Sequence, residues 1–359
     1  MMEEKNHCIY FKDYESKLTY KSGEHIFPAG LGGIQKLPKG YVSHDFNNSV
    51  SGIETEFMRR SPIALPRQFY GPGKRGNLNE KRATKSEVAL MYDVNSPLGI
   101  EFGYISLSKP FSLPQLKINT NATFNFYSDK SLGEPLEQFN NFIKSLKKFK
   151  SRYKTYIDDR IDRESFLIGY EEEEKKWHLA FNNENHGIEI EKWIKIVLEQ
   201  EKHKTSAPKY GKMQPKVNQQ MKIDIDAYFR VYAKTAFNFL AYVKGQEFAL
   251  QSCFDPIRDW IKDGGDNHFV ATSKGNNPLK VLKAIPLPDK SHIIILLKIN
   301  NDLIAYVRFY DDTFGYFVRL CENYTDDWGM DGFICDWQNR EEYELFDYIR
   351  MINENKIKL

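Results

Sequence analysis

The residue pair Glu24-His25 and the amide pair Asn47-Asn48 are the positions in this chain best suited to chemistry. Hydrolysis of a phosphodiester needs a hard cation to neutralise the phosphate oxygens and a base to take a proton from water. Magnesium prefers oxygen ligands and keeps several of its waters, so one or two protein oxygens suffice. The Glu24 carboxylate and the Asn47 side-chain carbonyl could supply those oxygens, and His25 could be the base.

The elements around these residues must bend to bring them together. Neighbouring residues on an extended segment point to opposite faces, so Glu24 and His25 would diverge on a regular strand. The run PAGLGG at residues 28–33 breaks regular structure directly afterwards and permits a bend. Residues 49–58 are expected to continue from the amide pair as a short helix.

The stretch SGEHIFPAGLGG, followed by LPKGYVSHDFNN and SGIETEF, resembles the HNH (ββα-metal) endonucleases over roughly residues 8–80. Their core has an acid before His-Ile, then Leu-Gly-Gly, then C-x-x-C-N-N and a helix with an acidic residue. The resemblance implies that His25 is the general base, Glu24 a metal ligand and Asn47 the ligand in the final position, with Asn48 its substitute if the register shifts by one. It also implies a Mg²⁺ or Mn²⁺ cofactor and a nucleic-acid substrate, with DNA favoured.

The chain departs from this family at the structural zinc site. The positions that match the two C-x-x-C pairs are Cys8, Phe11, Ser43 and Phe46, and one cysteine cannot hold a tetrahedral zinc. We therefore expect no structural zinc and apolar packing in its place. The central Asn of the family triad is not evident either, since the loop at residues 39–41 has none. A second hypothesis stays open: a catalytically degenerate HNH scaffold that binds nucleic acid or protein.

Basic residues gather between positions 59 and 85, where Glu80 is the only acid, although the whole chain has a net charge of +2. Phosphate contacts dominate nucleic-acid affinity, so a local basic patch matters more than the overall charge. The glycines of GPGKRG at residues 71–76 would let backbone N–H groups approach a phosphate, although the loop lacks the ending of a Walker motif. A basic surface loop without this role is the alternative. The predicted nucleic-acid contacts are Arg67, Lys74, Arg75, Lys81 and Arg82.

The length of 359 residues and the pattern of apolar residues predict an α+β protein in three parts. Residues 1–85 would form an N-terminal ββα-metal (HNH) module with its basic loop. Residues 86–215 would hold β segments, a basic helix and a linker, and residues 216–359 a mixed helix and antiparallel-sheet module. We expect strands at 88–92, 103–107 and 122–127, a helix from Glu134-Pro135 with an apolar stripe reaching Tyr156, and a linker at 200–222.

The C-terminal part is expected to contain a helix pair and an antiparallel meander. An aspartate at 224 or 226 can cap a helix that ends at Gly245, and Asp255-Pro256 can begin another that ends at Gly264. Strands follow at 292–299, 303–309 and 316–320, and the histidines here are expected to be structural. The resemblance allows this part to choose the target, bind a protein partner or regulate the nuclease, as HNH-like effectors of bacterial defence do.

Cysteine usage and hydropathy bear on the compartment. The four cysteines form no C-x-x-C pair and no disulfide-like spacing, which favours a reducing cytoplasm. The polar start MMEEKNHC is unlike a signal peptide, and the apolar run at 293–297 is too short to cross a bilayer. We expect a soluble cytoplasmic protein without a membrane partner.

Overall fold

The structure is a computed structural model with mixed α and β elements, and it divides into two compact units. Residues 1–84 and 221–359 form the first unit, and residues 85–220 form the second. The boundaries lie close to those expected, but the N-terminal and C-terminal parts share one core instead of forming separate domains. The structure describes residues 6–12, 18–93, 98–119, 121, 123–149, 153–182, 190–199, 215–217, 223–273, 285–354 and 356.

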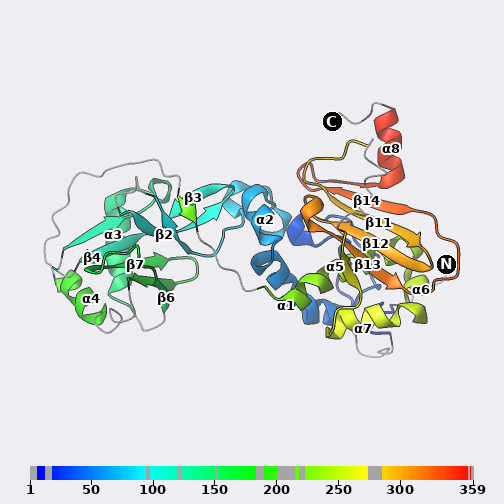
Figure 1. The fold of residues 1–359 in the computed structure, drawn as a ribbon, viewed down its shortest axis with the longest axis horizontal. Helices are drawn as coiled ribbons and strands as arrows, with labels where there is room; N and C mark the ends of the chain where they lie inside the picture. The colour runs from blue at the N-terminus through cyan, green and yellow to red at the C-terminus, as the bar shows by residue number, and fades with distance from the viewer. Residues whose placement is uncertain are drawn as a thin grey trace. The chain divides into compact units, whose positions relative to one another are not determined.

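A six-stranded antiparallel sheet organises the first unit (Figure 1). Its central strands form the predicted meander, which is confirmed, because apolar side chains alternate between the two faces of the sheet. In spatial order the strands are β10 (Val270–Thr272), β13 (Gly315–Cys321), β12 (Asp302–Arg308), β11 (His292–Ile299), β14 (Asp331–Asp336) and β15 (Glu341–Glu344).

The helices of this unit begin and end where capping residues direct them. Asp224 accepts a hydrogen bond from the N–H of Ala227 at 3.0 Å, and Gly245 ends that helix, which confirms the predicted element. The helix predicted at Asp255-Pro256 is also confirmed and ends before Gly264. The helices are α1 (His44–Arg60), α2 (Ala64–Tyr70), α5 (Ile225–Lys244), α6 (Gln246–Ala249), α7 (Asp255–Asp263) and α8 (Leu345–Asn353).

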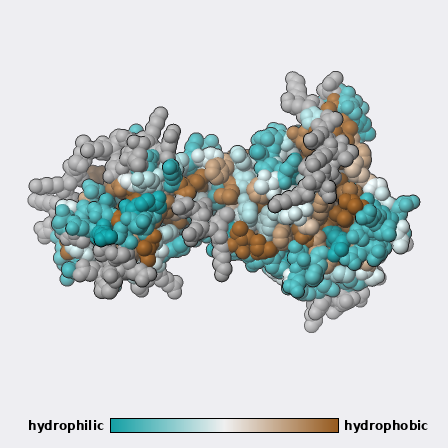
Figure 2. Space-filling model, viewed as in Figure 1, coloured by the Kyte–Doolittle hydropathy of each residue, from teal (hydrophilic) through white to brown (hydrophobic). Residues whose placement is uncertain are grey.

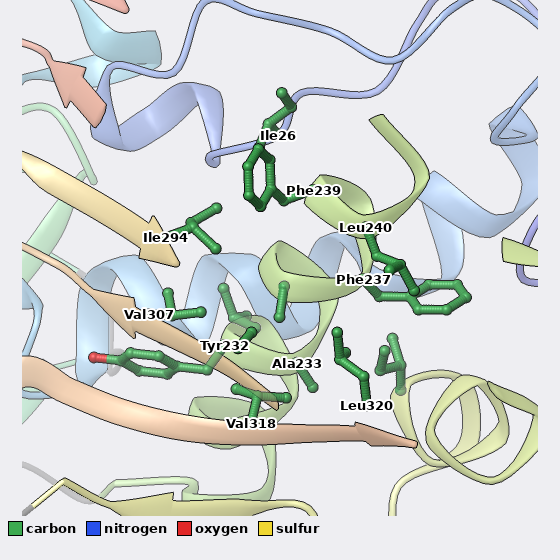
Figure 3. Close-up of a cluster of buried hydrophobic side chains, with 14 of the residues drawn as sticks. Ile26, Tyr232, Ala233, Phe237, Phe239, Leu240, Ile294, Val307, Val318 and Leu320 are labelled. Carbon is green, nitrogen blue, oxygen red and sulfur yellow. The ribbon is translucent and has the colours of Figure 1, made fainter. Parts of the chain in front are cut away.

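Helix α5 forms the centre of the core. It packs on one side against β11, β12 and β13 and on the other against α1. Figure 3 shows Tyr232 and Phe239 of α5 with Val307 of β12 and Val318 of β13, together with Ile26 from the N-terminal segment. The opposite face of the sheet packs against α8. Because α5 is buried on both sides, residues 1–84 share their core with the sheet.

The described residues of the second unit form two sheets and two α-helices. A four-stranded sheet has the order β3 (Lys109–Ser112), β2 (Ile100–Ser106), β1 (Ala89–Tyr92) and β9 (Lys216–Val217). A five-stranded sheet has the order β5 (Phe124–Tyr127), β4 (Gln115–Asn119), β7 (Ser165–Glu171), β8 (Lys176–Phe181) and β6 (Tyr153–Ile157). Apolar residues of both sheets form one core, and α3 (Pro135–Leu146) and α4 (Ile190–Glu199) form another with the five-stranded sheet.

The predicted length of the helix at Pro135 was wrong. Helix α3 ends at Leu146, and residues Tyr153–Ile157 form strand β6 instead of two further helical turns. The segment YKTYI is rich in aromatic and β-branched residues, which favour a pleated surface over a helix. Most of the predicted linker at 200–222 lies outside the described residues. Within it the structure describes residues 215–217, and Lys216–Val217 pairs with β1.

In the part of the chain that the structure describes, no helix is both long enough and apolar enough to span a bilayer. Figure 2 shows that hydrophilic residues cover most of the described surface on the visible face, with apolar residues in smaller patches. Two exposed apolar residues of this kind, Leu65 and Phe69, lie on α2.

Candidate functional site

The Glu24-His25 pair lies in a short hairpin. His25 pairs with Lys36 in an antiparallel bridge, the N–H of Leu37 donates to the Glu24 carbonyl at 2.7 Å, and the N–H of Ile26 donates to the Gln35 carbonyl at 3.0 Å. The predicted bend follows directly, and Gly32 takes the left-handed conformation that glycine adopts without strain, at φ 98°. A bridged hairpin followed by α1 is therefore the local order of elements.

Three side chains from distant parts of the sequence hold the turn of this hairpin. Arg67 Nε donates to the Gly30 carbonyl at 3.1 Å, and His292 Nε2 donates to the Leu31 carbonyl at 3.0 Å. Glu342 accepts the N–H of Ile34 at 3.0 Å. Nδ1 of His292 accepts the N–H of Tyr310, and burial lowers the pKa of His292 to about 3. His292 is therefore a neutral histidine with a structural role, as predicted.

Cys8, Phe11, Ser43 and Phe46, the positions compared with two C-x-x-C pairs, contact one another in two pairs. The sulfur of Cys8 accepts the N–H of Ser43 at 3.3 Å. The ring of Phe11 packs edge-on against Phe46 with centroids 5.7 Å apart. Tyr10 stacks on the other side of Phe46 at 3.7 Å. Aromatic packing therefore connects residues 8–11 to residues 43–46.

Helix α1 carries Asn47. The helix begins at His44 because the Ser43 hydroxyl accepts the N–H of Phe46 at 3.1 Å. The side-chain oxygen Oδ1 of Asn47 is buried and has no hydrogen-bond partner among the described residues. A buried carbonyl oxygen without a donor is unfavourable, so this atom is a candidate ligand. Asn48, the alternative ligand, is exposed on the neighbouring side of the helix.

A buried lysine joins the hairpin to α1. Lys234 of α5 donates from Nζ to Glu24 Oε1 at 2.5 Å and to Glu54 Oε1 at 2.9 Å, and its side chain is 6% exposed. Burial acts to lower the pKa of this amine, but the two carboxylates outweigh burial and place the pKa above its ordinary value. The Lys234 ammonium is therefore a permanent positive charge between two acids.

The face of α5 that carries Lys234 also contacts the backbone of the Glu24-His25 pair. Asn238 Nδ2 donates to the His25 carbonyl at 2.9 Å, and Asn238 Oδ1 accepts the hydroxyl of Tyr10 at 2.7 Å. Lys234 and Asn238 were not among the predicted site residues. Their signal was present in the sequence, because Arg230, Lys234 and Asn238 recur every four residues in a helix that is otherwise largely apolar.

The environment of His25 keeps its ring neutral. Burial, together with the positive charges of Lys36 and Lys234, lowers the pKa of His25 to about 4, although the Glu54 carboxylate acts to raise it. An imidazole with this pKa is unprotonated at neutral pH. It can therefore accept a proton without first losing one.

The predicted site residues converge in part. Glu24 and His25 lie at the Glu54–Lys234 cluster, whereas Asn47 lies on the same face of α1 as Glu54 but about 10 Å away along the helix axis, as a spacing of seven residues dictates. In the described part of the chain no hydrogen bond joins His25 to Asn47.

A divalent cation such as Mg²⁺ requires oxygen ligands, and Glu24 and Asn47 are the candidate donors. Among the described residues, no group of three or more His, Cys, Asp and Glu side chains could hold a metal. Glu24 and Asn47 still offer the oxygen ligands that Mg²⁺ and Mn²⁺ prefer, and such ions need few protein ligands. The residues fit a cation in donor type, with the unpartnered Asn47 oxygen as the clearest indication. Glu24 would have to share its carboxylate between the cation and Lys234.

The basic loop at residues 71–76 presents two of the predicted cations to solvent. Lys74 and Arg75 are exposed, and so is Arg82, while the side chain of Lys81 lies outside the described residues. The Tyr310 hydroxyl donates to the Gly71 carbonyl at 2.7 Å and so anchors the start of the loop. The exposed charges therefore sit on a fixed backbone.

Arg67 does not fit the role predicted for it. Its guanidinium is buried and donates to the carbonyls of Gly30, Met58 and Gly73. A guanidinium has five N–H donors and no acceptor, so these bonds direct the group inward. Arg67 therefore connects the hairpin turn to the basic loop and is not placed to meet a phosphate.

Replacing Lys74 and Arg75 together with alanine should weaken nucleic-acid binding and flatten its salt dependence. Each lost phosphate contact lowers the slope of log K against log salt by about 0.9, so the double variant should lose about 1.8 units. Fluorescence anisotropy with a duplex over a salt series measures this slope. The matched control is Arg350→Ala with Lys356→Ala, which removes two exposed charges from the same unit. Parallel slopes for wild type and the loop variant would remove the loop from the interface.

Comparisons of the chain with protein-family models, with curated proteins and with solved structures gave no match. The functional assignment therefore rests on the chemistry of the described residues. The hairpin, α1 and the basic loop carry that chemistry, and all three belong to the first unit.

Proposed function

We propose that the first unit is a cation-dependent endonuclease of the HNH type, which hydrolyses phosphodiester bonds in nucleic acid, with DNA the favoured substrate. The observation that carries the proposal is the buried, unpartnered Oδ1 of Asn47 on the helix that follows the Glu24-His25 hairpin. A polar oxygen in that state is stabilised by a cation. The neutral ring of His25 and the convergence of the four zinc-site positions support the same proposal.

In this proposal each residue has a separate task. His25 accepts the proton of the attacking water, which makes the water a better nucleophile toward phosphorus. Asn47 and Glu24 would each supply an oxygen to a Mg²⁺ or Mn²⁺ ion, which would neutralise charge on the phosphate. Because Asn47 lies about 10 Å along α1 from the cluster that holds Glu24, the hairpin and α1 would have to move for the two residues to share one ion. The exposed Lys74 and Arg75 hold the phosphate backbone, and the exposed ring of Tyr70 beside that loop offers a surface on which a base can stack.

The direct test is nicking of supercoiled plasmid by the full chain in Mg²⁺, in Mn²⁺ and in EDTA, across a range of pH. Nicked circles should form with either cation and not in EDTA. The acid limb of the rate should lie near pH 4, because His25 must be neutral to act and its pKa is lowered to about 4. An unperturbed histidine would give a limb near about pH 6.5. Cation-independent nicking would refute the proposal, and a limb near pH 6.5 would remove His25 as the base.

A second candidate is favoured by one specific observation. Lys234 already pairs with both Glu24 and Glu54, so these acids have a counter-charge without a metal ion. A protein of this kind would bind nucleic acid through the basic loop and cut nothing. Binding in the anisotropy assay without nicking under any cation would select this candidate.

The idea that the C-terminal part regulates the nuclease, with or without a protein partner, takes a different form in this fold. Lys234 and Asn238 of α5 hold the Glu24-His25 pair, so the C-terminal segment is part of the site. Removing that segment would remove these contacts and expose the core around Ile26 and Phe46. Any regulation by the C-terminal segment must therefore be measured on the full chain, because a truncated chain would lack these contacts.

A further inference from the structure

We infer that the exposed ring of Tyr70 and a hollow beside it bind unpaired bases, so that the protein prefers single-stranded nucleic acid over a closed duplex. The inference deepens the proposed function and rests on its nucleic-acid binding, because it names the form of the substrate. It requires neither a bound cation nor cleavage. Its test measures binding alone.

Helix α2 ends in two aromatic residues that are open to solvent. The exposed fractions of Phe69 and Tyr70 are 38% and 51%, and their ring centroids lie 6.4 Å apart. The exposed cations Lys74 and Arg75 follow within a few residues of the chain. Proteins bind single strands by combining cations that meet the phosphates with aromatic faces on which bases stack. The end of α2 and the basic loop together offer both groups.

The ring of Tyr70 is carried by a fixed backbone. The Tyr310 hydroxyl donates to the carbonyl of Gly71, the next residue, at 2.7 Å. The Lys290 ammonium lies 5.3 Å from the centroid of the Tyr70 ring, which is a cation–π distance. Trp337 Nε1 donates to the Lys290 carbonyl at 2.8 Å. Two buried aromatic residues therefore hold the ring and the lysine beside it, which lowers the entropy lost when a ligand binds.

Lys290 also lines the hollow, which has a volume of about 450 Å³ and includes Asp289, Arg308, Asp311 and Asp312 in its lining. Small-molecule sites have volumes of about 300–1,000 Å³, so the hollow is large enough for a small ligand. Because one lysine both covers the Tyr70 ring and lines the hollow, the two features adjoin each other.

The charges that line the hollow are largely paired with one another. Arg308 Nη1 lies 3.1 Å from Asp312 Oδ1, and Lys290 Nζ lies 3.9 Å from Asp311 Oδ2. Asp289 adds a third carboxylate to these two cations. Such a lining repels a free phosphate. The neutral edge of a base carries both hydrogen-bond donors and acceptors, and it matches a lining that offers both.

A closed duplex can use neither feature, because its bases are paired and stacked on one another and it presents only groove edges and phosphates. In a single strand, one base can stack on Tyr70 while a neighbouring base enters the hollow, with Lys290 between them. Lys74 and Arg75 can contact the phosphates of either form. Duplex binding therefore persists, at lower affinity.

Fluorescence anisotropy of the full chain in EDTA measures this preference. The probes are a labelled strand of about 16 nucleotides that cannot pair with itself, and the same strand annealed to its complement. The single strand should bind at least about fivefold more tightly than the duplex, the lower end of what one stacked base contributes. Tyr70→Ala should remove this difference by weakening single-strand binding, whereas Tyr70→Phe, which keeps the ring, should retain it. Thr313→Leu, which narrows the hollow, should reduce it.

The matched control is Phe346→Ala. Phe346 is another exposed aromatic residue of the same unit, on α8, with an exposed fraction of 57%. The control should bind both probes as wild type does. A loss of single-strand affinity as large as that of Tyr70→Ala would count against a specific site at Tyr70.

Equal affinity of wild type for the two probes overturns the inference, and so does an unchanged preference in Tyr70→Ala or in Thr313→Leu. Absence of binding to either probe overturns both the inference and the proposed function. A single-strand preference that Tyr70→Ala removes, in a protein that nicks no plasmid with any cation, supports the inference and defeats the proposed cleavage. Cation-dependent nicking by a wild type that binds both probes alike gives the opposite result.

Discussion

Replacing His25 with alanine should lower the rate of cation-dependent nicking by at least about a hundredfold, the lower end of what a general base contributes. The ring is neutral at pH 7 because burial and the charges of Lys36 and Lys234 lower its pKa to about 4. The fold should persist, because Asn238 holds the backbone carbonyl of His25 and not its ring. Nicking rate, circular dichroism and duplex binding together measure the effect.

The matched control for this variant is His44→Ala. His44 is a partly exposed histidine at the first position of α1, and the proposed chemistry makes no use of it. It should cut at the wild-type rate. Undiminished cleavage by His25→Ala would show that another group is the base, and loss of duplex binding in the same variant would show that His25 contacts the substrate instead.

Replacing Arg258 with methionine should lower the free energy of unfolding by about 3–5 kcal/mol, since each buried carbonyl left without a donor costs about 1–3 kcal/mol. The fully buried guanidinium donates to the carbonyls of Ile9 and Ala249, each at 2.6 Å, and to Asp255. It thereby connects the N-terminal segment to α6 and α7. Urea unfolding followed by tryptophan fluorescence measures the change.

Arg350→Met is the control for this second variant. Arg350 pairs with Asp347 on α8, and its side chain is 67% exposed. Exposed ion pairs contribute about 0–1 kcal/mol, so the control should stay within that range. A loss below about 1 kcal/mol for Arg258→Met would contradict a single core built from both ends of the chain.

The elements set by local patterns could be predicted from the sequence. Strands β11 to β13 follow from apolar segments bounded by turn residues, and α5 follows from Asp224 at its start and Gly245 at its end. Helix α3 shows where apolar periodicity fails to predict the end of a helix. Its apolar stripe continues past Leu146 in the sequence, but strand pairing with β8 wins over helical periodicity at Tyr153.

The joining of the two ends of the chain could not be predicted in this way. Nothing in the spacing around Tyr10 shows that its ring contacts Phe237 of α5, with centroids 5.4 Å apart, because that contact depends on the packing of the whole unit. The same limit applies to the site. The Glu24-His25 pair and Asn47 could be selected locally, whereas the contact of Lys234 with Glu24 and with Glu54 of α1 depends on tertiary structure.

Arg67 shows the converse error. Its place in a run of basic residues predicted a phosphate contact, but three buried carbonyls compete for its donors and hold it inside. Composition alone cannot separate a buried arginine from an exposed one. The exposed neighbours Lys74 and Arg75 keep the predicted role as proposals.

The position of a bound cation tests the proposed site most directly. Crystals of the full chain grown with Mn²⁺ allow its anomalous scattering to locate the ion. The proposal predicts a peak at metal–ligand distance, about 2.0–2.6 Å, from Asn47 Oδ1, with the hairpin moved so that a Glu24 oxygen lies in the same shell. Peaks confined to surface acids, with Asn47 Oδ1 still without a partner and Glu24 still held by Lys234, would contradict it.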